Sequence, residues 1–214
     1  MAETGYPILA REGWWHTASA VAVAVLIHFF AGYAWAIPFW IFAAFIIQFF
    51  RDPPRQIPDS PGGVICPADG RIIAQGEADD PYLKRRAKRL SVFMNVFDVH
   101  SNRIPVTGKI QECWYSKGKF INASLDKASS DNERNALWIR TDQGQDVVVV
   151  QVAGLIARRI LCYVQSGERV TRGERYGFIR FGSRVDVYLP LNAHFKVSLG
   201  DNVKGAADVI AQLT

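Results

Sequence analysis

The sequence predicts a mainly β domain, of sandwich or barrel-like form with lipoyl-like hairpins, behind an N-terminal hydrophobic helical membrane anchor. Two observations carry this prediction. Residues 18–50 of the 214-residue chain include no Asp, Glu, Lys or Arg, a composition typical of a membrane segment. Beyond residue 50, short runs rich in β-branched and aromatic residues recur about every ten residues with turn residues between them. This pattern favours β-strands over alternating βαβ units.

Residues 1–50 are expected to form the anchor. One straight helix over 18–50 would reach about 50 Å, against a hydrocarbon core of about 30 Å. Gly32 and Pro38 lie near its middle, and proline kinks or ends a helix. The segment is therefore either one tilted or kinked spanning helix, or a hairpin of two short helices that enters one leaflet and returns.

The flanking residues favour the hairpin. Arg11 precedes the apolar segment, and Arg51 and Arg55 follow it. Because positive charge marks the cytoplasmic side of a membrane, arginine at both ends is typical of a hairpin with both ends in the cytoplasm. Four tryptophans fit an interfacial belt, in which the apolar indole keeps its N–H near water. They are Trp14, Trp15, Trp35 and Trp40.

A linker rich in Pro and Gly is predicted at 51–63, and a β-rich domain at 64–214. The predicted strands are 64–66, 71–74, 90–94, 108–110, 136–139, 146–152 and 185–189. The segment 79–89 is predicted to be a helix or a long loop. Segments 67–72 and 167–174 both resemble the hairpins of lipoyl- and biotinyl-type sandwich domains.

The net charge of +5 is partly local, because five of the six residues in 84–89 are basic. This run is either a solvated face or a contact with anionic lipid. Nucleic-acid binding is not expected, since the run lacks interleaved aromatic residues and the chain is anchored.

Three widely spaced cysteines, Cys66, Cys113 and Cys162, form no CxxC motif and no zinc set with the four histidines. We expect buried thiols in a reducing compartment and no metal.

Asp98 and His100 are the candidate proton-transfer pair. On a strand, side chains at i and i+2 share a face, so Asp98 could orient or charge-stabilise the imidazole. The imidazole could then move protons near neutral pH. The alternative is a histidine held by hydrogen bonds at a strand end. His194 is a secondary candidate.

Gly182 and Ser183 stand together inside an apparent strand. Glycine in a strand often marks a bulge or a close backbone approach, and it tolerates strained geometry that leaves its carbonyl open to attack. The hydroxyl of Ser183 could attack that carbonyl and cut the chain. The alternative is an ordinary bulge or turn.

Segment 97–108, Phe-Asp-Val-His-Ser-Asn-Arg-Ile-Pro-Val-Thr-Gly, resembles the FDVHxNRxPxxG signature of phosphatidylserine decarboxylases. Segments 51–55, 67–70, 132–135 and 181–186 match other blocks of that family in the family's order. The resemblance runs from about residue 50 to the C-terminus and is similar to the compact bacterial and archaeal-type branch. It implies a pyruvoyl-dependent carboxy-lyase that makes phosphatidylethanolamine from phosphatidylserine at a membrane surface.

The resemblance also implies roles for residues. Self-cleavage between Gly182 and Ser183 would leave a β chain of 1–182 and an α chain of 183–214, with Ser183 converted to the pyruvoyl group that forms a Schiff base with the substrate. No pyridoxal phosphate or metal is implied. His100, oriented by Asp98, would protonate the carbanion left after CO2 departs, and is a candidate base for self-cleavage. Arg103 is a candidate ligand for the substrate carboxylate or phosphate, or a structural ion pair.

The implied partners are phosphatidylserine, an anionic membrane surface, and the α and β chains of one precursor, with a homo-oligomer as a further option. The implied location is the bacterial inner membrane, with the catalytic domain on its cytoplasmic side.

One departure concerns the self-cleavage base. Some branches carry a further histidine where this chain has Ala123 or a neighbour in 120–124, and no histidine occurs between Ser101 and Ala193. The base is then His100 or His194, or the chain is cut by a strain-driven backbone shift with only weak base assistance. A different class of function is a membrane-tethered lipoyl or biotinyl carrier modified at Lys127, since Asp126-Lys127-Ala128 resembles a lipoyl attachment hairpin.

Overall fold

The computed structural model describes residues 6–125, 128–155, 159–180 and 182–214. They divide into a helical unit that ends at Pro54 and a β unit that begins at Arg55. The helices are η1 (Arg11–Gly13), α1 (Trp14–Ala31), α2 (Tyr33–Phe49) and α3 (Ala128–Asp131). The strands are β1 (Gly63–Ile65), β2 (Gly70–Asp80), β3 (Arg85–Met94), β4 (Ser101–Arg103), β5 (Gly108–Ser116), β6 (Arg134–Thr141), β7 (Asp146–Val152), β8 (Ile160–Cys162), β9 (Arg169–Val170), β10 (Arg175–Ile179), β11 (Ser183–Leu189), β12 (His194–Phe195), β13 (Asn202–Val203) and β14 (Val209–Gln212).

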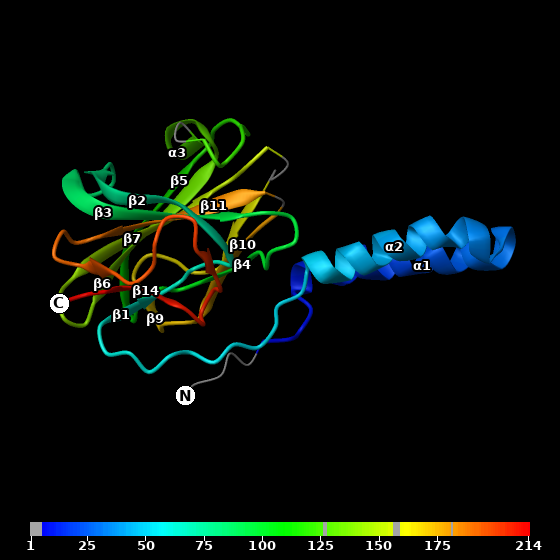
Figure 1. Cartoon of the computed structure of the whole chain (residues 1–214), viewed down its shortest axis with the longest axis horizontal. Coiled ribbons are helices and arrows are strands. Elements are labelled where there is room, and N and C mark those ends of the chain that lie inside the picture. The colour runs from blue at the N-terminus through cyan, green and yellow to red at the C-terminus, as the bar shows by residue number, and fades with distance from the viewer. Residues whose placement is uncertain (1–5, 126–127, 156–158, 181) are drawn as a thin grey trace. The chain divides into compact units, whose positions relative to one another are not determined.

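The helical unit holds two apolar helices that pack against each other (Figure 1). The break between them falls at Gly32, whose φ of +87° is one that glycine adopts readily. Pro38 lies inside α2 and does not end it. The segment from Arg11 to Ala31 is long and apolar enough to cross a membrane, by length and composition, and α2 is shorter. The four tryptophans expected in an interfacial belt are between 41% and 83% exposed.

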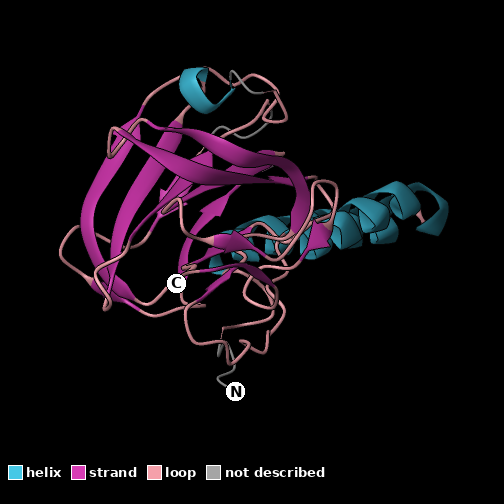
Figure 2. Cartoon of the chain, turned by 60° about the vertical axis from the view of Figure 1, so that its left-hand side comes forward, coloured by secondary structure: helices cyan, strands magenta, loops and turns pink. Residues whose placement is uncertain are grey.

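The β unit is built on a curled eight-stranded sheet, and the prediction of a mainly β fold is confirmed (Figure 2). The strand order is β13-β2-β3-β11-β7-β6-β5-β9. Strand β11 pairs antiparallel with β3 on one side and with β7 on the other. Because β11 is central and all seven of its residues are buried, it is among the most constrained segments of the sheet.

Two three-stranded sheets, β1-β14-β12 and β4-β10-β8, complete the unit. The two faces of the large sheet bury different clusters. Val185 and Val187 of β11 belong to the main core, whereas Tyr188 belongs to a second cluster that includes Ala128 of α3. Alternation along the strand therefore sends Ser183 toward the main core and Arg184 toward the other face.

The prediction of a helix or long loop at 79–89 is wrong. Strands β2 and β3 run through it and pair from Arg71 to Asp80 against Phe93 to Arg85. Asp80, only 1% exposed, accepts hydrogen bonds from the backbone N–H groups of Tyr82 and Leu83 and so closes a tight hairpin turn. Pairing across the hairpin determines the strand conformation here, and the composition of the segment alone does not encode that pairing.

The basic run at 84–89 has partners within the β unit. Arg86 pairs with Asp79 at 3.0 Å and with Glu77 at 3.6 Å. Arg85 donates to the carbonyl oxygen of Asp146, and Lys88 donates to that of Ala193. The acidic strand β2 therefore balances much of the charge that the sequence concentrates in β3.

Candidate active site

The Gly182-Ser183 bond lies where the chain crosses from one sheet to another. Strand β10 ends at Ile179 in the small sheet, and β11 begins at Ser183 in the large one. Gly182 has φ of +57°, in the left-handed region that disfavours side chains. Ser183 is in register with Met94 of β3. The backbone on the C-terminal side of the bond is thus held by the sheet, while the bond itself occupies the irregular crossing.

The hydroxyl of Ser183 is buried and has no hydrogen-bond partner among the described residues. Leaving a buried polar group unsatisfied costs about 1–3 kcal/mol, so such groups are uncommon and often functional. A hydroxyl next to a left-handed glycine carbonyl, with no bond to hold it elsewhere, can act as a nucleophile toward that carbonyl.

Two residues from other segments border the carbonyl of Gly182. A Cβ built on Gly154 would lie 1.6 Å from the Gly182 oxygen and 2.7 Å from its carbon. The same Cβ would lie 3.4 Å from the Cβ of Ala123. The sequence placed Ala123 where some branches of the family have a histidine, and the structure brings that position beside the carbonyl. Gly154 carried no signal in the sequence.

Asn132 connects the two segments that border the carbonyl. It is fully buried and exchanges hydrogen bonds with the backbone N–H and C=O of Ile121 at 3.0 and 2.8 Å. Its amide also donates to the carbonyl oxygen of Ala153 at 2.6 Å. These bonds fix the neighbours of Ala123 and Gly154 with respect to each other. Asn132 lies in a family block of the sequence, but its role is visible only in three dimensions.

Arg184, the residue after Ser183, anchors the same region from the opposite face of the large sheet. Its buried guanidinium donates to the carbonyl oxygens of Ala123 at 2.9 Å and Leu125 at 3.1 Å, and to the hydroxyl of Ser129. It pairs with Asp186 two residues later, with Nε 2.9 Å from a carboxylate oxygen. Both members of this pair are 1% exposed. The pair ties β11 to the segment that covers the Gly182 carbonyl.

His100 is fully buried and lies just before β4, which pairs with β10. Its Nδ1 is 2.9 Å from the carbonyl oxygen of Asp98. Since a carbonyl oxygen only accepts, Nδ1 carries the proton in this contact, and in the neutral form of the ring the lone pair is then on Nε2. The backbone carbonyl of His100 accepts from the N–H of Ile179, four residues before Ser183.

The segment that holds Asp98 and His100 is a turn followed by irregular backbone, so the strand geometry that would put the two side chains on one face is not met. A carboxylate oxygen of Asp98 accepts from the N–H of Asn95 at 2.8 Å and stabilises this turn. The main-chain oxygen of Asp98 is in contact with the imidazole. The side-chain alternation of a strand therefore does not apply here.

A chain of buried amides lies behind β4. Asn135 donates to Gln151 at 3.1 Å, and Gln151 donates to Asn102 at 2.8 Å. Asn102 in turn points its amide at the sulfur of Met94, the register partner of Ser183, at 3.9 Å. This chain fixes β4, and with it the backbone at His100, against the large sheet.

Arg103 also lies in β4 and is 3% exposed, in register with Arg175 of β10. Residues of two other family blocks, 51–55 and 67–70, contact each other. Arg55 pairs with Asp69 at 2.7 Å, and Asp69 also accepts a hydrogen bond from the backbone N–H of Gly205 at 2.8 Å. His194 is exposed and belongs to the β1-β14-β12 sheet. Lys127 lies outside the described residues.

All three cysteines are free thiols, with Cys66 buried and the other two half-buried. Burial raises the pKa of Cys66 well above its ordinary value and raises that of Cys113 to about 11. Among the described residues, no group of three or more His, Cys, Asp or Glu side chains has the geometry of a metal site.

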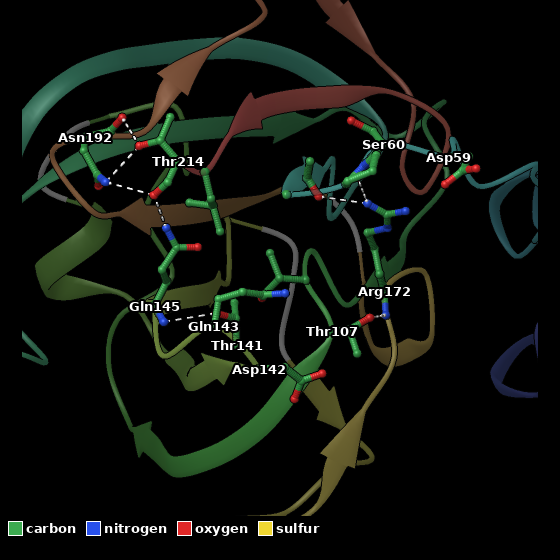
Figure 3. Close-up of a pocket in the computed structure, with 15 residues that line it drawn as sticks. Asp59, Ser60, Thr107, Thr141, Asp142, Gln143, Gln145, Arg172, Asn192 and Thr214 are labelled. Atoms are coloured by element: carbon green, nitrogen blue, oxygen red, sulfur yellow. Dashed lines mark hydrogen bonds between the residues drawn. The ribbon is translucent and has the colours of Figure 1, made fainter.

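A cavity of about 600 Å³ in the β unit lies away from these residues (Figure 3). Its lining includes Arg172, which donates to backbone carbonyls of the linker, and Asn192, which bonds to Thr214. Asn192 follows the C-terminal end of β11, roughly 20 Å along the strand from Ser183 at about 3.3 Å per residue. None of the site residues predicted from the sequence lines this cavity.

The comparisons with known proteins agree with the blocks found in the sequence. The family model for phosphatidylserine decarboxylase matches residues 42–211. A phosphatidylserine decarboxylase proenzyme of Nitrosomonas europaea is 61% identical over 97% of this chain and 96% of its own length. Proenzymes of the same name from Aromatoleum aromaticum and Burkholderia cenocepacia are each 58% identical over 97% of both chains. The chain therefore belongs to the phosphatidylserine decarboxylase family.

Proposed function

We propose that this chain decarboxylates phosphatidylserine to phosphatidylethanolamine, after cutting itself between Gly182 and Ser183. The observation that carries the proposal is the buried, unpartnered hydroxyl of Ser183 beside the left-handed Gly182. The comparisons support the reaction, since the relatives are named phosphatidylserine decarboxylase proenzymes. A proenzyme is a precursor, as a self-cutting chain requires.

In the proposed cut, Oγ of Ser183 attacks the carbonyl carbon of Gly182, and the acyl group moves from nitrogen to oxygen to give an ester. Elimination breaks the ester bond, releases 1–182 with a C-terminal carboxylate, and leaves dehydroalanine at 183. Addition of water and loss of ammonia then convert residue 183 to pyruvoyl. Gly154, which has no side chain, lies against the oxygen of this carbonyl.

The surroundings of residue 183 fit a pyruvoyl group. The side chain of Ser183 is buried, its backbone is in register with Met94 of β3, and the rest of β11 pairs with both β3 and β7, which belong to the 1–182 chain. The two chains therefore stay together after the cut. When formed, the group supplies a carbonyl that acts as the electron sink for decarboxylation.

The chain's own residues would handle protons at this site. We propose that Nε2 of His100 takes the proton from the Ser183 hydroxyl and later donates a proton to the substrate carbon. Asp98 holds Nδ1 protonated through its backbone oxygen and so keeps Nε2 available as the base. Arg103 is proposed as a ligand for the anionic part of the substrate, because it lies in β4 three residues from His100.

Intact-mass measurement together with a phosphatidylserine assay tests the proposal. We expect two chains divided between 182 and 183, an α chain without a free N-terminal amine, and release of CO2 from phosphatidylserine. An active preparation that contains only one uncut chain would refute the mechanism. An uncut chain with a lipoyl-sized mass increment on Lys127 would instead support a carrier module.

We further propose that residues 1–50 anchor the enzyme in the bacterial inner membrane, with the β unit on the cytoplasmic side. The exposed apolar side chains of α1 and α2 support this, as do the arginines at both ends of the helical pair. Protease added to sealed inside-out vesicles should digest the β unit, whereas right-side-out vesicles should protect it. The opposite pattern would place the β unit on the other side.

A further inference from the structure

Three exposed apolar side chains lie on connections that adjoin the Gly182-Ser183 bond through chain neighbours and sheet register. Phe97, Leu125 and Leu155 are 65%, 44% and 67% exposed, and we call them the apolar rim. They come from three separate connections: β3 to β4, β5 to α3, and β7 to β8. Scattered single apolar residues on a surface need no explanation, but a group around one site does.

The chain geometry places each rim residue close to the bond. Phe97 follows Met94, the register partner of Ser183, by three residues. Leu155 directly follows Gly154, which borders the Gly182 carbonyl. Leu125 is two residues beyond Ala123, and the guanidinium of Arg184 binds the backbone carbonyl of both. At no more than about 3.6 Å per residue, each rim residue is within roughly 11 Å of a residue that contacts or pairs with the bond.

Two arginines lie beside the rim. Ile160 of β8 is in register with Ile179 of β10, and Arg159 and Arg180 are the next residues of the two strands on the side toward Gly182. Arg159 is exposed and Arg180 half-buried. Apolar side chains next to arginines match the chemistry of a membrane interface, where acyl chains meet anionic phosphates.

The substrate gives a reason for such a surface, so the inference rests on the proposed function. Residue 183 is fully buried in the β unit. A diacyl lipid cannot leave the bilayer to reach it, because each methylene that becomes exposed to water lowers the equilibrium constant for leaving the bilayer roughly fourfold. The protein must instead bring the opening of the site to the bilayer. An anchor alone holds the enzyme at the membrane but does not orient the site.

We propose that the apolar rim inserts into the lipid bilayer, with Arg159 and Arg180 at the phosphate level, and docks the site onto the membrane that holds its substrate. This contact is made by the β unit itself and is distinct from the anchor helices. It delivers the serine headgroup to residue 183 while the acyl chains stay in the bilayer.

The first test compares two physical forms of one substrate on the full chain. The variant Phe97→Ser/Leu125→Ser/Leu155→Ser should lose about tenfold or more in kcat/KM on phosphatidylserine in vesicles, because three apolar side chains no longer insert. It should keep its rate on a short-chain, monomerically soluble phosphatidylserine. Leu191→Ser is the matched control, since Leu191 is 47% exposed but lies beyond the far end of β11. Unchanged vesicle kinetics, or an equal loss on both substrates, would overturn the proposal.

The second test does not depend on activity. A photoreactive benzophenone amino acid at position 97 should form adducts with phospholipid when the full chain is irradiated in vesicles, whereas the same group at position 191 should not. Absence of lipid adducts at 97, or adducts only with another protein, would refute membrane docking. A wild-type chain that fails to decarboxylate either substrate would refute the proposed function, while the crosslink still decides the docking.

Discussion

The α-carbon of Gly154 lies against the carbonyl oxygen of Gly182, so closely that a Cβ at position 154 would sit 1.6 Å from that oxygen. No real Cβ approaches an oxygen so closely, so a side chain here would displace the carbonyl. A residue without a side chain is therefore a steric requirement at position 154, next to the proposed cut.

Gly154→Ala should slow self-cleavage by about a hundredfold or more, since a shift near 1 Å at a reacting centre can have an effect of that size. The accumulation of uncut chain, followed by intact mass after synthesis, measures this rate. Gly205→Ala is the control, because a Cβ there would meet no atom closer than 3.2 Å. Normal cleavage of Gly154→Ala would show that the carbonyl has room to move.

Ser183→Ala should leave one uncut and inactive chain, since no hydroxyl remains to attack or to be converted. Ser91→Ala is a matched control: Ser91 is also fully buried with an unpartnered hydroxyl, but it lies on the opposite face of the sheet. We expect that variant to cut normally. Decarboxylation by Ser183→Ala would remove Ser183 from the mechanism.

His100→Gln should abolish decarboxylation, because glutamine can hydrogen-bond but does not take up and return a proton. Slower appearance of the α chain would also assign His100 as the self-cleavage base. His194→Gln serves as the control, since His194 is exposed in another sheet. If His100→Gln cuts at the normal rate yet fails to turn over substrate, the base of the first step is another group. Full turnover would exclude His100 from both steps.

Asp186→Asn should lower the free energy of unfolding by about 3 kcal/mol or more, because it leaves the guanidinium of Arg184 buried without its counter-charge. Denaturant titration of the uncut Ser183→Ala chain, with and without the second change, measures this loss. Asp142→Asn removes half of an exposed pair with Arg169 and should change stability little. Equal losses in the free energy of unfolding for the two variants would mean that burial of the Arg184–Asp186 pair does not add to its contribution to stability.

Stability should fall as the pH rises from about 10 to 12. Burial raises the pKa of Tyr188 to about 12, so the unfolded chain, with an ordinary tyrosine pKa near 10, loses its proton first. This contribution to stability, up to roughly 3 kcal/mol, is complete below pH 10 and is lost as the pH rises through the folded pKa. Tyr188→Phe should flatten the alkaline part of the stability curve. Tyr163→Phe, at a half-exposed tyrosine, should leave the curve steep.

The strands illustrate what local sequence carries and what it does not. The run at 146–152 coincides with β7, because five of its seven residues are valine and the strand is buried on both faces. Strands β2 and β3 extend well beyond their predicted ends. Backbone pairing across the hairpin and cross-strand ion pairs such as Arg86–Asp79 stabilise residues that have no intrinsic strand preference. The break between the anchor helices falls at Gly32 and not at Pro38, because glycine alone adopts the backbone angle of the turn.

The sequence by itself determined the mainly β class, the charge-free N-terminal segment and the Gly182-Ser183 pair within a run of family blocks, because these are properties of residue order. Only the tertiary structure decided what surrounds that pair. Gly154 and Ala123 meet the Gly182 carbonyl, and Asn132 joins their two segments, through contacts between residues far apart in the chain. Such contacts depend on strand pairing and burial, which act between segments and leave no local pattern in any one of them.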